Sequence, residues 1–153
     1  MPWERGRAAI ERLLEDGELE LVTPSPDLAA RLMDDAAAHL ESADAIKDVD
    51  PTGAYQLAYD GARKACSALL ALQGLRATTR GGHVAVQEAM REQFGPVFAP
   101  YARMRRRRRD SEYPDLDTPS VTVADAEEGI AQAADMVDAA SKLIHSDQVS
   151  PFR

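Results

Sequence analysis

Six arginines between residues 103 and 109 are the strongest chemical feature of the sequence. The segment reads Tyr101-Ala-Arg-Met-Arg-Arg-Arg-Arg-Arg-Asp-Ser-Glu-Tyr113-Pro. A guanidinium group keeps its charge at any physiological pH and donates two parallel hydrogen bonds to a phosphate or a carboxylate. The segment therefore predicts either a site for a phosphate-bearing ligand or a set of ion pairs with acidic side chains of the protein itself.

The overall charge of the chain hides this concentration of arginine. The 153 residues include 18 Lys and Arg against 26 Asp and Glu, a formal net charge of −8. Outside the six arginines, 12 basic residues face the 26 acidic ones, so the rest of the chain carries a charge of −14. A net acidic chain ordinarily argues against a nucleic-acid partner, but one cationic segment on an acidic body allows phosphate binding at that segment.

Other residue types exclude several classes of site. The single cysteine, Cys66, excludes a disulfide framework and a zinc site built from cysteines. The three histidines, His39, His83 and His145, lack the spacing of metal ligands, so we expect neither a metal nor a cofactor. No apolar run is long enough to cross a bilayer, and residues 1–11 lack the apolar stretch of a signal peptide. We therefore expect a cytoplasmic protein without membrane contact.

Apolar residues recur with the helical period along most of the chain. Abundant alanine and an aromatic content of 5% favour closely packed helices over sheets. We expect an all-α fold, an antiparallel bundle of about five helices over residues 26–153, with residues 1–25 as an N-terminal helical arm docked on it. Residues 18–22 could form a strand, but no partner strand is evident. The helices are predicted at residues 3–14, 27–48, 52–73, 83–94, 97 or 100 to 113, and 123–145.

The helical period also predicts which arginines face inward. Tyr101 and Met104 lie on the apolar side of their helix, and Arg108 falls in the same stripe with Arg105 beside it. An inward guanidinium must find acidic or hydrogen-bonding partners, or line a pocket. Asp60 on the second long helix is one candidate partner for Arg108. The arginines expected to point elsewhere are Arg103, Arg106 and Arg109.

Three segments in combination resemble the HEPN family. They are the end of the second long helix (residues 59–75), the Gly81-Gly82-His83 that opens the next helix, and the Arg-rich segment that ends in Asp110-Ser-Glu-Tyr113-Pro. The resemblance covers about residues 27–145 and is closest to actinobacterial-type HEPN proteins. It implies a helical bundle that forms a homodimer and belongs to a toxin–antitoxin or defence system, often beside a nucleotidyltransferase.

Many HEPN proteins cleave RNA without a metal, using a motif of arginine, four residues and histidine. In that motif the arginine holds the phosphate and the histidine acts as acid or base on the 2′-hydroxyl. In this chain Tyr113 occupies the histidine position that follows Arg108, and Ser111 occupies it if counting starts at Arg106. The resemblance makes Arg108 and Tyr113 the candidate catalytic residues, although a tyrosine hydroxyl, with an ordinary pKa of about 10, is a poor base at neutral pH. The candidate phosphate-binding residues are Arg105, Arg106, Arg107 and Arg109.

Two functions follow as alternatives. In the first, the protein is an RNA- or nucleotide-binding module of a toxin–antitoxin or defence system, with or without a degenerate, metal-independent endoribonuclease activity. In the second, it is a non-catalytic interaction partner of a nucleotidyltransferase or an antitoxin protein, and Tyr113 is open to modification. His83 is expected to cap a helix or lie at the surface, with a catalytic role as the alternative.

Overall fold

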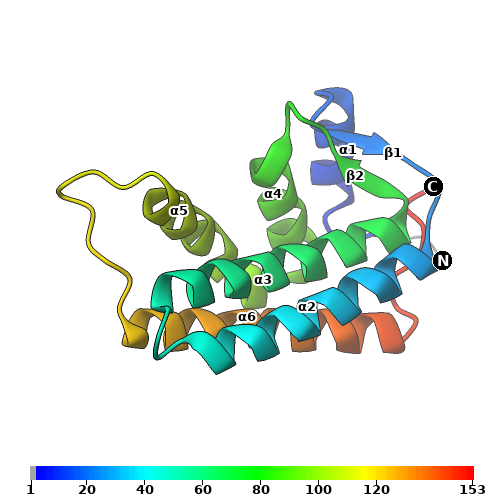
Figure 1. Ribbon diagram of the computed structural model, residues 1–153. Coiled ribbons are helices and arrows are strands. Elements are labelled where there is room, and N and C mark those ends of the chain that lie inside the picture. The colour runs from blue at the N-terminus through cyan, green and yellow to red at the C-terminus, as the bar shows by residue number, and fades with distance from the viewer. Residues whose placement is uncertain (1–2) are drawn as a thin grey trace.

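The computed structural model describes residues 3–153 and is mostly helical, as predicted. Over these residues it has six α-helices, one short 3-10 helix and one two-stranded ribbon (Figure 1). The HEPN-like form of the bundle stays a prediction. The elements are α1 (Arg7–Glu15), β1 (Leu19–Leu21), α2 (Pro26–Ile46), α3 (Pro51–Gln73), β2 (Leu75–Ala77), α4 (Gly82–Phe94), η1 (Pro96–Phe98), α5 (Pro100–Glu112) and α6 (Val123–His145).

Helix α3 lies at the centre of the fold. It packs along its length against α2 and α6, and α4 and α5 lie across another of its sides (Figure 1). Ala58, Ala62 and Ala65 of this helix are completely buried, and small side chains shorten the distance between helix axes. A Cβ on Gly61 would lie 3.2 Å from the carbonyl oxygen of Ala36, so α2 and α3 approach closely there.

The helix directions differ from a fully antiparallel bundle. The helices α2 and α3 form an antiparallel hairpin, but α6 runs in the same direction as α3 (Figure 1). The reason is that α4 and α5 lie across α3 instead of running up and down beside it. The loop after α5 then returns the chain to the end of the bundle at which α3 begins.

Local signals determine where the long helices begin and end. The side chains of Ser25 and Asp50 accept hydrogen bonds from the first turns of α2 and α3, and Gly74 ends α3 with a φ of 72°. Thr122 and Asp125 form a reciprocal capping box at the start of α6. Helix α1 starts later than the predicted residue 3, because Gly6 adopts a left-handed conformation just before it.

The strand considered at residues 18–22 does have a partner, which the sequence-based prediction missed. Strand β1 pairs antiparallel with β2, with Leu19 opposite Ala77 and Leu21 opposite Leu75. The second strand was predicted as part of the connection between two helices. The whole of α2 and α3 separates the two strands in the chain, so only the fold brings them together.

The segment predicted as an N-terminal arm contributes to the main hydrophobic core. Ile10 and Leu13 are completely buried in it, as is Phe152 near the other end of the chain. Residues 1–2 of that segment lie outside the described residues. The division into an arm at 1–25 and a bundle at 26–153 stays a prediction.

Candidate functional site

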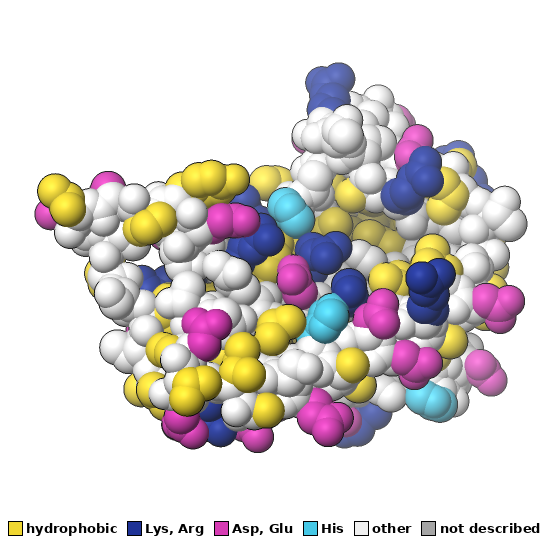
Figure 2. All heavy atoms as spheres, viewed as in Figure 1, with side chains coloured by type: hydrophobic (Ala, Val, Ile, Leu, Met, Phe, Trp, Pro, Cys, Tyr) yellow, Lys and Arg dark blue, Asp and Glu magenta, His cyan; other side chains and the backbone are white. Residues whose placement is uncertain are grey.

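Helix α5 distributes its arginines over different faces, because Tyr101 and Met104 are completely buried and set its rotation. The protein surface around it combines Lys and Arg side chains with a histidine above α3, between α4 and α5 (Figure 2). We call Arg103 and Arg107, which point toward α6, the paired face. We call Arg105 and Arg108 the open face, because their charges act on Tyr59 of α3 and His83 of α4. Arg106 and Arg109 are exposed.

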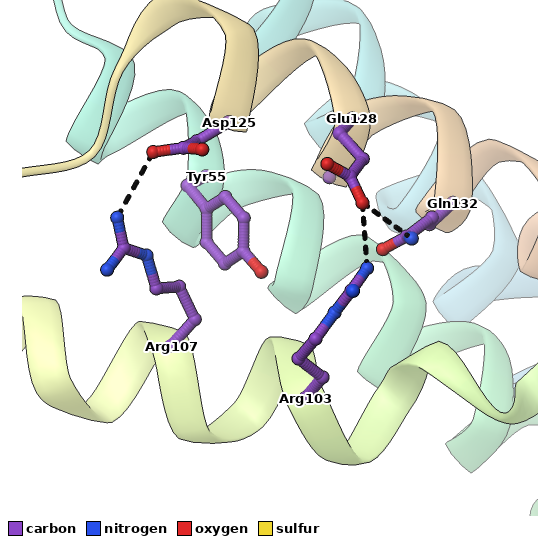
Figure 3. Close-up of a pocket in the computed structure, with 7 residues that line it drawn as sticks. Tyr55, Arg103, Arg107, Asp125, Glu128 and Gln132 are labelled. Atoms are coloured by element: carbon purple, nitrogen blue, oxygen red, sulfur yellow. Dashed lines mark hydrogen bonds and ion pairs between the residues drawn. The ribbon is translucent and has the colours of Figure 1, made fainter.

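Both arginines of the paired face are bonded to acidic side chains of α6. Arg103 Nη2 donates to Glu128 Oε1 at 2.8 Å, and Arg107 Nη2 donates to Asp125 Oδ2 at 3.1 Å (Figure 3). Together with Tyr55 they line a small cavity of about 190 Å³. The carboxylates neutralise both guanidinium groups, including that of Arg107, which the sequence-based prediction had listed among the phosphate-binding residues.

The open face has a different environment. The Cζ of Arg108 lies 5.6 Å from the centroid of the Tyr59 ring, a cation–π contact. The Nε atoms of Arg105 and Arg108 are both buried, and neither has a hydrogen-bond partner within residues 3–153. A buried donor without an acceptor is costly, and a charged one more so. An anionic ligand that accepted hydrogen bonds from these two Nε–H groups would remove this cost, so the two donors indicate a candidate anion site.

The inward direction predicted for Arg108 agrees with its contact to Tyr59, but Asp60, the candidate partner considered for it, pairs elsewhere. Asp60 pairs instead with Arg63, at 3.6 Å from Nε to Oδ1. Arg108 pairs with Glu112, one turn along its own helix, at 3.3 Å from Nη1 to Oε2. In each case a carboxylate on the same helix, three or four positions away, is closer than one on a neighbouring helix.

His83 completes the open face. Its Nδ1 lies 3.1 Å from the Tyr59 hydroxyl and 3.4 Å from the Tyr101 hydroxyl, and the two hydroxyls are 3.4 Å apart. These contacts hold the ring beside the arginines, and its Nε2 has no partner among residues 3–153. We call Arg63, Arg105, Arg108 and His83 the His83 cluster.

The close contact of Gly81 with Glu18, just before β1, helps to determine where His83 lies. A Cβ on Gly81 would collide with the carbonyl oxygen of Glu18, so only glycine fits at this contact. Thr78 reinforces the contact, since its hydroxyl donates to the Gly17 carbonyl at 2.6 Å and accepts from the Gly81 N–H at 3.1 Å. The residues beside the ribbon thus fix the first turn of α4, where the backbone N–H groups give the helix a positive end. The glycine pair was the sequence signal for this position.

The environment of His83 lowers its pKa. His83 is an exposed residue, and partial burial of its ring is the largest cause. The charges of Arg63, Arg105 and Arg108 add to the effect, while Asp60 acts in the opposite direction. The ordinary pKa of histidine is about 6.5, so His83 is neutral at neutral pH and has one ring nitrogen able to accept a proton. A ligand with negative charge would offset the arginines and raise this pKa.

The two tyrosines beside His83 keep their protons. Burial raises the pKa of Tyr59, and it raises the pKa of Tyr101 further. Both hydroxyls therefore act as neutral hydrogen-bonding groups. Their role at the site is to position the histidine.

Tyr113 lies apart from this cluster. It follows the last residue of α5, its side chain is 78% exposed, and no hydrogen bond of its hydroxyl is present within residues 3–153. Five positions along a helix correspond to a rotation of about 140°, which turns Tyr113 away from Arg108. The structure thus brings together Arg105 and Arg108 of the predicted site residues and adds His83 and Arg63, but it does not place Tyr113 with them.

The comparisons with models of protein families, with curated proteins and with solved structures found no match for this chain. Within the described residues, no group of three or more His, Cys, Asp and Glu side chains could hold a metal ion. No helix of that part of the chain is long and apolar enough to span a membrane.

Proposed function

We propose that the His83 cluster binds a phosphate group of RNA or of a nucleotide. The observation that carries this proposal is the pair of buried, unpartnered Nε donors of Arg105 and Arg108 beside a fixed, neutral histidine. This is the role that the HEPN resemblance implies, an RNA- or nucleotide-binding module of a cytoplasmic toxin–antitoxin or defence system. The same resemblance implies that the protein works as a homodimer.

The arrangement also suits metal-independent cleavage of RNA. Arg105 and Arg108 would hold the phosphate and stabilise the charge that develops on it. In the tautomer in which His83 Nδ1 donates to the Tyr59 hydroxyl, Nε2 keeps its lone pair and accepts the proton of the 2′-hydroxyl. The 2′ oxygen then attacks phosphorus to form a 2′,3′-cyclic phosphate, and the P–O5′ bond breaks. The leaving 5′ oxygen takes a proton from water, and the hydroxide so formed removes the proton that His83 had accepted. His83 would thus supply, from α4, the histidine that is absent after Arg108 in the sequence.

The test compares the two faces of α5. Arg105→Ala/Arg108→Ala and Arg103→Ala/Arg107→Ala remove the same charge from the same helix, and binding of labelled single-stranded RNA is followed by fluorescence anisotropy in EDTA. Two charged hydrogen bonds are worth roughly 3 kcal/mol, so we expect binding about 100-fold weaker in the first variant. The second should change binding by less than about three-fold. Equal losses in the two variants, or no RNA binding by the wild type, would contradict the proposal.

Catalysis is tested separately from binding. His83→Ala should abolish any cleavage of RNA in EDTA but keep most of the RNA affinity, because the arginines remain. Cleavage that persists in His83→Ala would exclude the histidine as the base. Binding without cleavage in the wild type would leave a binding module.

A second function is favoured by the loop after α5. Tyr113 and Leu116 are large exposed side chains only three residues apart, which suits contact with another protein. This supports the alternative of a non-catalytic partner of a nucleotidyltransferase or an antitoxin protein, with the Tyr113 hydroxyl accessible to modification. Co-purification of such a protein that is lost in Tyr113→Ala/Leu116→Ser, with RNA binding absent, would favour it over the first.

A further inference from the structure

A second hollow lies beneath the two-stranded ribbon. It has a volume of about 430 Å³ and is bounded by the start of α2, the C-terminal part of α3, strand β2 and α4. Its walls are mainly aliphatic, with Leu28 and Leu32 on one side and Val86 on another. Its polar lining residues include Ser67 and Arg76, and the guanidinium of Arg76 is held by Glu20 of the neighbouring strand. Leu28 is 47% exposed, so this wall presents apolar surface to solvent.

This hollow shares two walls with the His83 cluster. Ser67 follows Arg63 by four positions on α3, and Val86 follows His83 by three positions on α4. Residues three or four apart lie on the same side of a helix, about one turn or 5.4 Å apart. Figure 2 shows a hollow with hydrophobic side chains inside it, next to the Lys, Arg and His side chains. The apolar hollow therefore begins about one helical turn from the phosphate site proposed above.

We propose that this hollow holds the base of the nucleotide whose phosphate lies at the His83 cluster. The proposal rests on the proposed function, since it extends the same site. One sugar ring separates a phosphate from its base, and this spacing suits two subsites one helical turn apart. The aliphatic side chains would pack on the faces of the base, while the Ser67 hydroxyl would meet its polar edge. The volume falls within the range of about 300–1,000 Å³ that is usual for small-molecule sites.

The test uses AMP, ribose 5-phosphate and dodecyl phosphate as probes, with affinities measured by calorimetry. Burial of the base should make AMP bind at least about ten-fold more tightly than ribose 5-phosphate. Ser67→Phe fills the hollow, and Leu28→Asp puts a charge on its exposed wall with little risk to folding. Both variants should bring the affinity for AMP down to that for ribose 5-phosphate and leave the latter unchanged. Ser42→Phe, at an exposed position outside the lining, is the matched control.

The outcomes separate this inference from the function on which it rests. Equal affinities of AMP and ribose 5-phosphate, both lost in Arg105→Ala/Arg108→Ala, would overturn the base subsite and leave the phosphate site standing. Dodecyl phosphate binding more tightly than AMP would overturn the base in favour of an alkyl chain. Binding of neither sugar phosphate would overturn the phosphate site and the base subsite together.

Discussion

The two faces of α5 carry the same residue type on the same helix, yet they do different things. On the paired face, Arg103 and Arg107 are held by carboxylates of α6. On the open face, Arg108 packs on Tyr59 and pairs with Glu112 of its own helix, and Arg105 and Arg108 each keep one buried donor without a partner in the described residues. A run of arginines is therefore not one site. The neighbouring helix decides which of its charges are used for packing and which remain available to a ligand.

The difference follows from where the acidic residues lie. Helix α6 presents Asp125 and Glu128 toward α5. Beside the open face, Asp60 is already paired with Arg63 on its own helix. The protein has many more carboxylates than it needs to neutralise six arginines. The difference between the two faces therefore depends on where the carboxylates lie and not on how many there are.

The largest effect on stability is expected at the paired face, from Gly129→Ala. A Cβ on Gly129 would lie 2.8 Å from Cε2 of the buried Tyr55 ring, so the ring or α6 must shift. We expect the free energy of unfolding to fall by about 1 to 2 kcal/mol in urea denaturation, although alanine favours the helix. In a Tyr55→Leu background the same change should cost much less. An equal cost in both backgrounds would show that the ring contact is not the cause.

The variant of the paired face should lose more stability than the variant of the open face, although it should lose less RNA binding. Arg103→Ala/Arg107→Ala removes two partly exposed ion pairs and should lower the free energy of unfolding by about 1 kcal/mol. Arg105→Ala/Arg108→Ala removes two unsatisfied donors together with the Arg108–Glu112 pair and the contact with Tyr59. These effects oppose one another, so stability should change by less than about 0.5 kcal/mol. Urea denaturation of both variants checks this. A larger loss from the open-face variant would mean that these arginines stabilise the fold.

The pKa of His83 reports on the open face alone. Nuclear magnetic resonance titration should give a pKa for His83 below the ordinary value of about 6.5. This pKa should rise in Arg105→Ala/Arg108→Ala and stay unchanged in Arg103→Ala/Arg107→Ala. Inorganic phosphate should raise it as well. Equal shifts in the two variants would contradict the specific coupling.

The same pKa predicts how stability changes with pH. A histidine with a lowered folded-state pKa binds fewer protons in the folded than in the unfolded protein once the pH falls below the unfolded value. The fold should therefore lose stability as the pH falls from about 7 through both pKa values, and the loss is complete below the folded one. In His83→Gln this part of the pH dependence should disappear. A pH dependence identical to that of the wild type would assign it to other groups.

The smallest effect is expected at Tyr113. Tyr113→Phe removes a hydroxyl that lies away from the His83 cluster, so RNA affinity and any cleavage should change by less than about two-fold. Anisotropy and gel assays measure both. A large loss would support the catalytic role of Tyr113 that its spacing from Arg108 predicts. It would also mean that Tyr113 reaches the site in an arrangement different from that of the single chain.

Much of the fold could be predicted because its determinants are local. The positions of the long helices follow from apolar periodicity and from caps such as Ser25 and Gly74, which act within a few residues of themselves. The ribbon could not be predicted, since Leu19 and Ala77 meet only after α2 and α3 have folded between them. For the same reason α6 could be located in the chain but not oriented relative to α3.

The sequence by itself determined that α5 would carry concentrated charge and that Arg108 would lie on its buried stripe, because the helical period relates neighbours on one helix. Only the tertiary structure decided that Arg103 and Arg107 are neutralised and that His83 joins Arg105 and Arg108. Those relations join side chains of α3, α4, α5 and α6, and no spacing along the chain encodes them. They arise from the way Gly81 fits against Glu18 and from the rotation of α5 set by Tyr101.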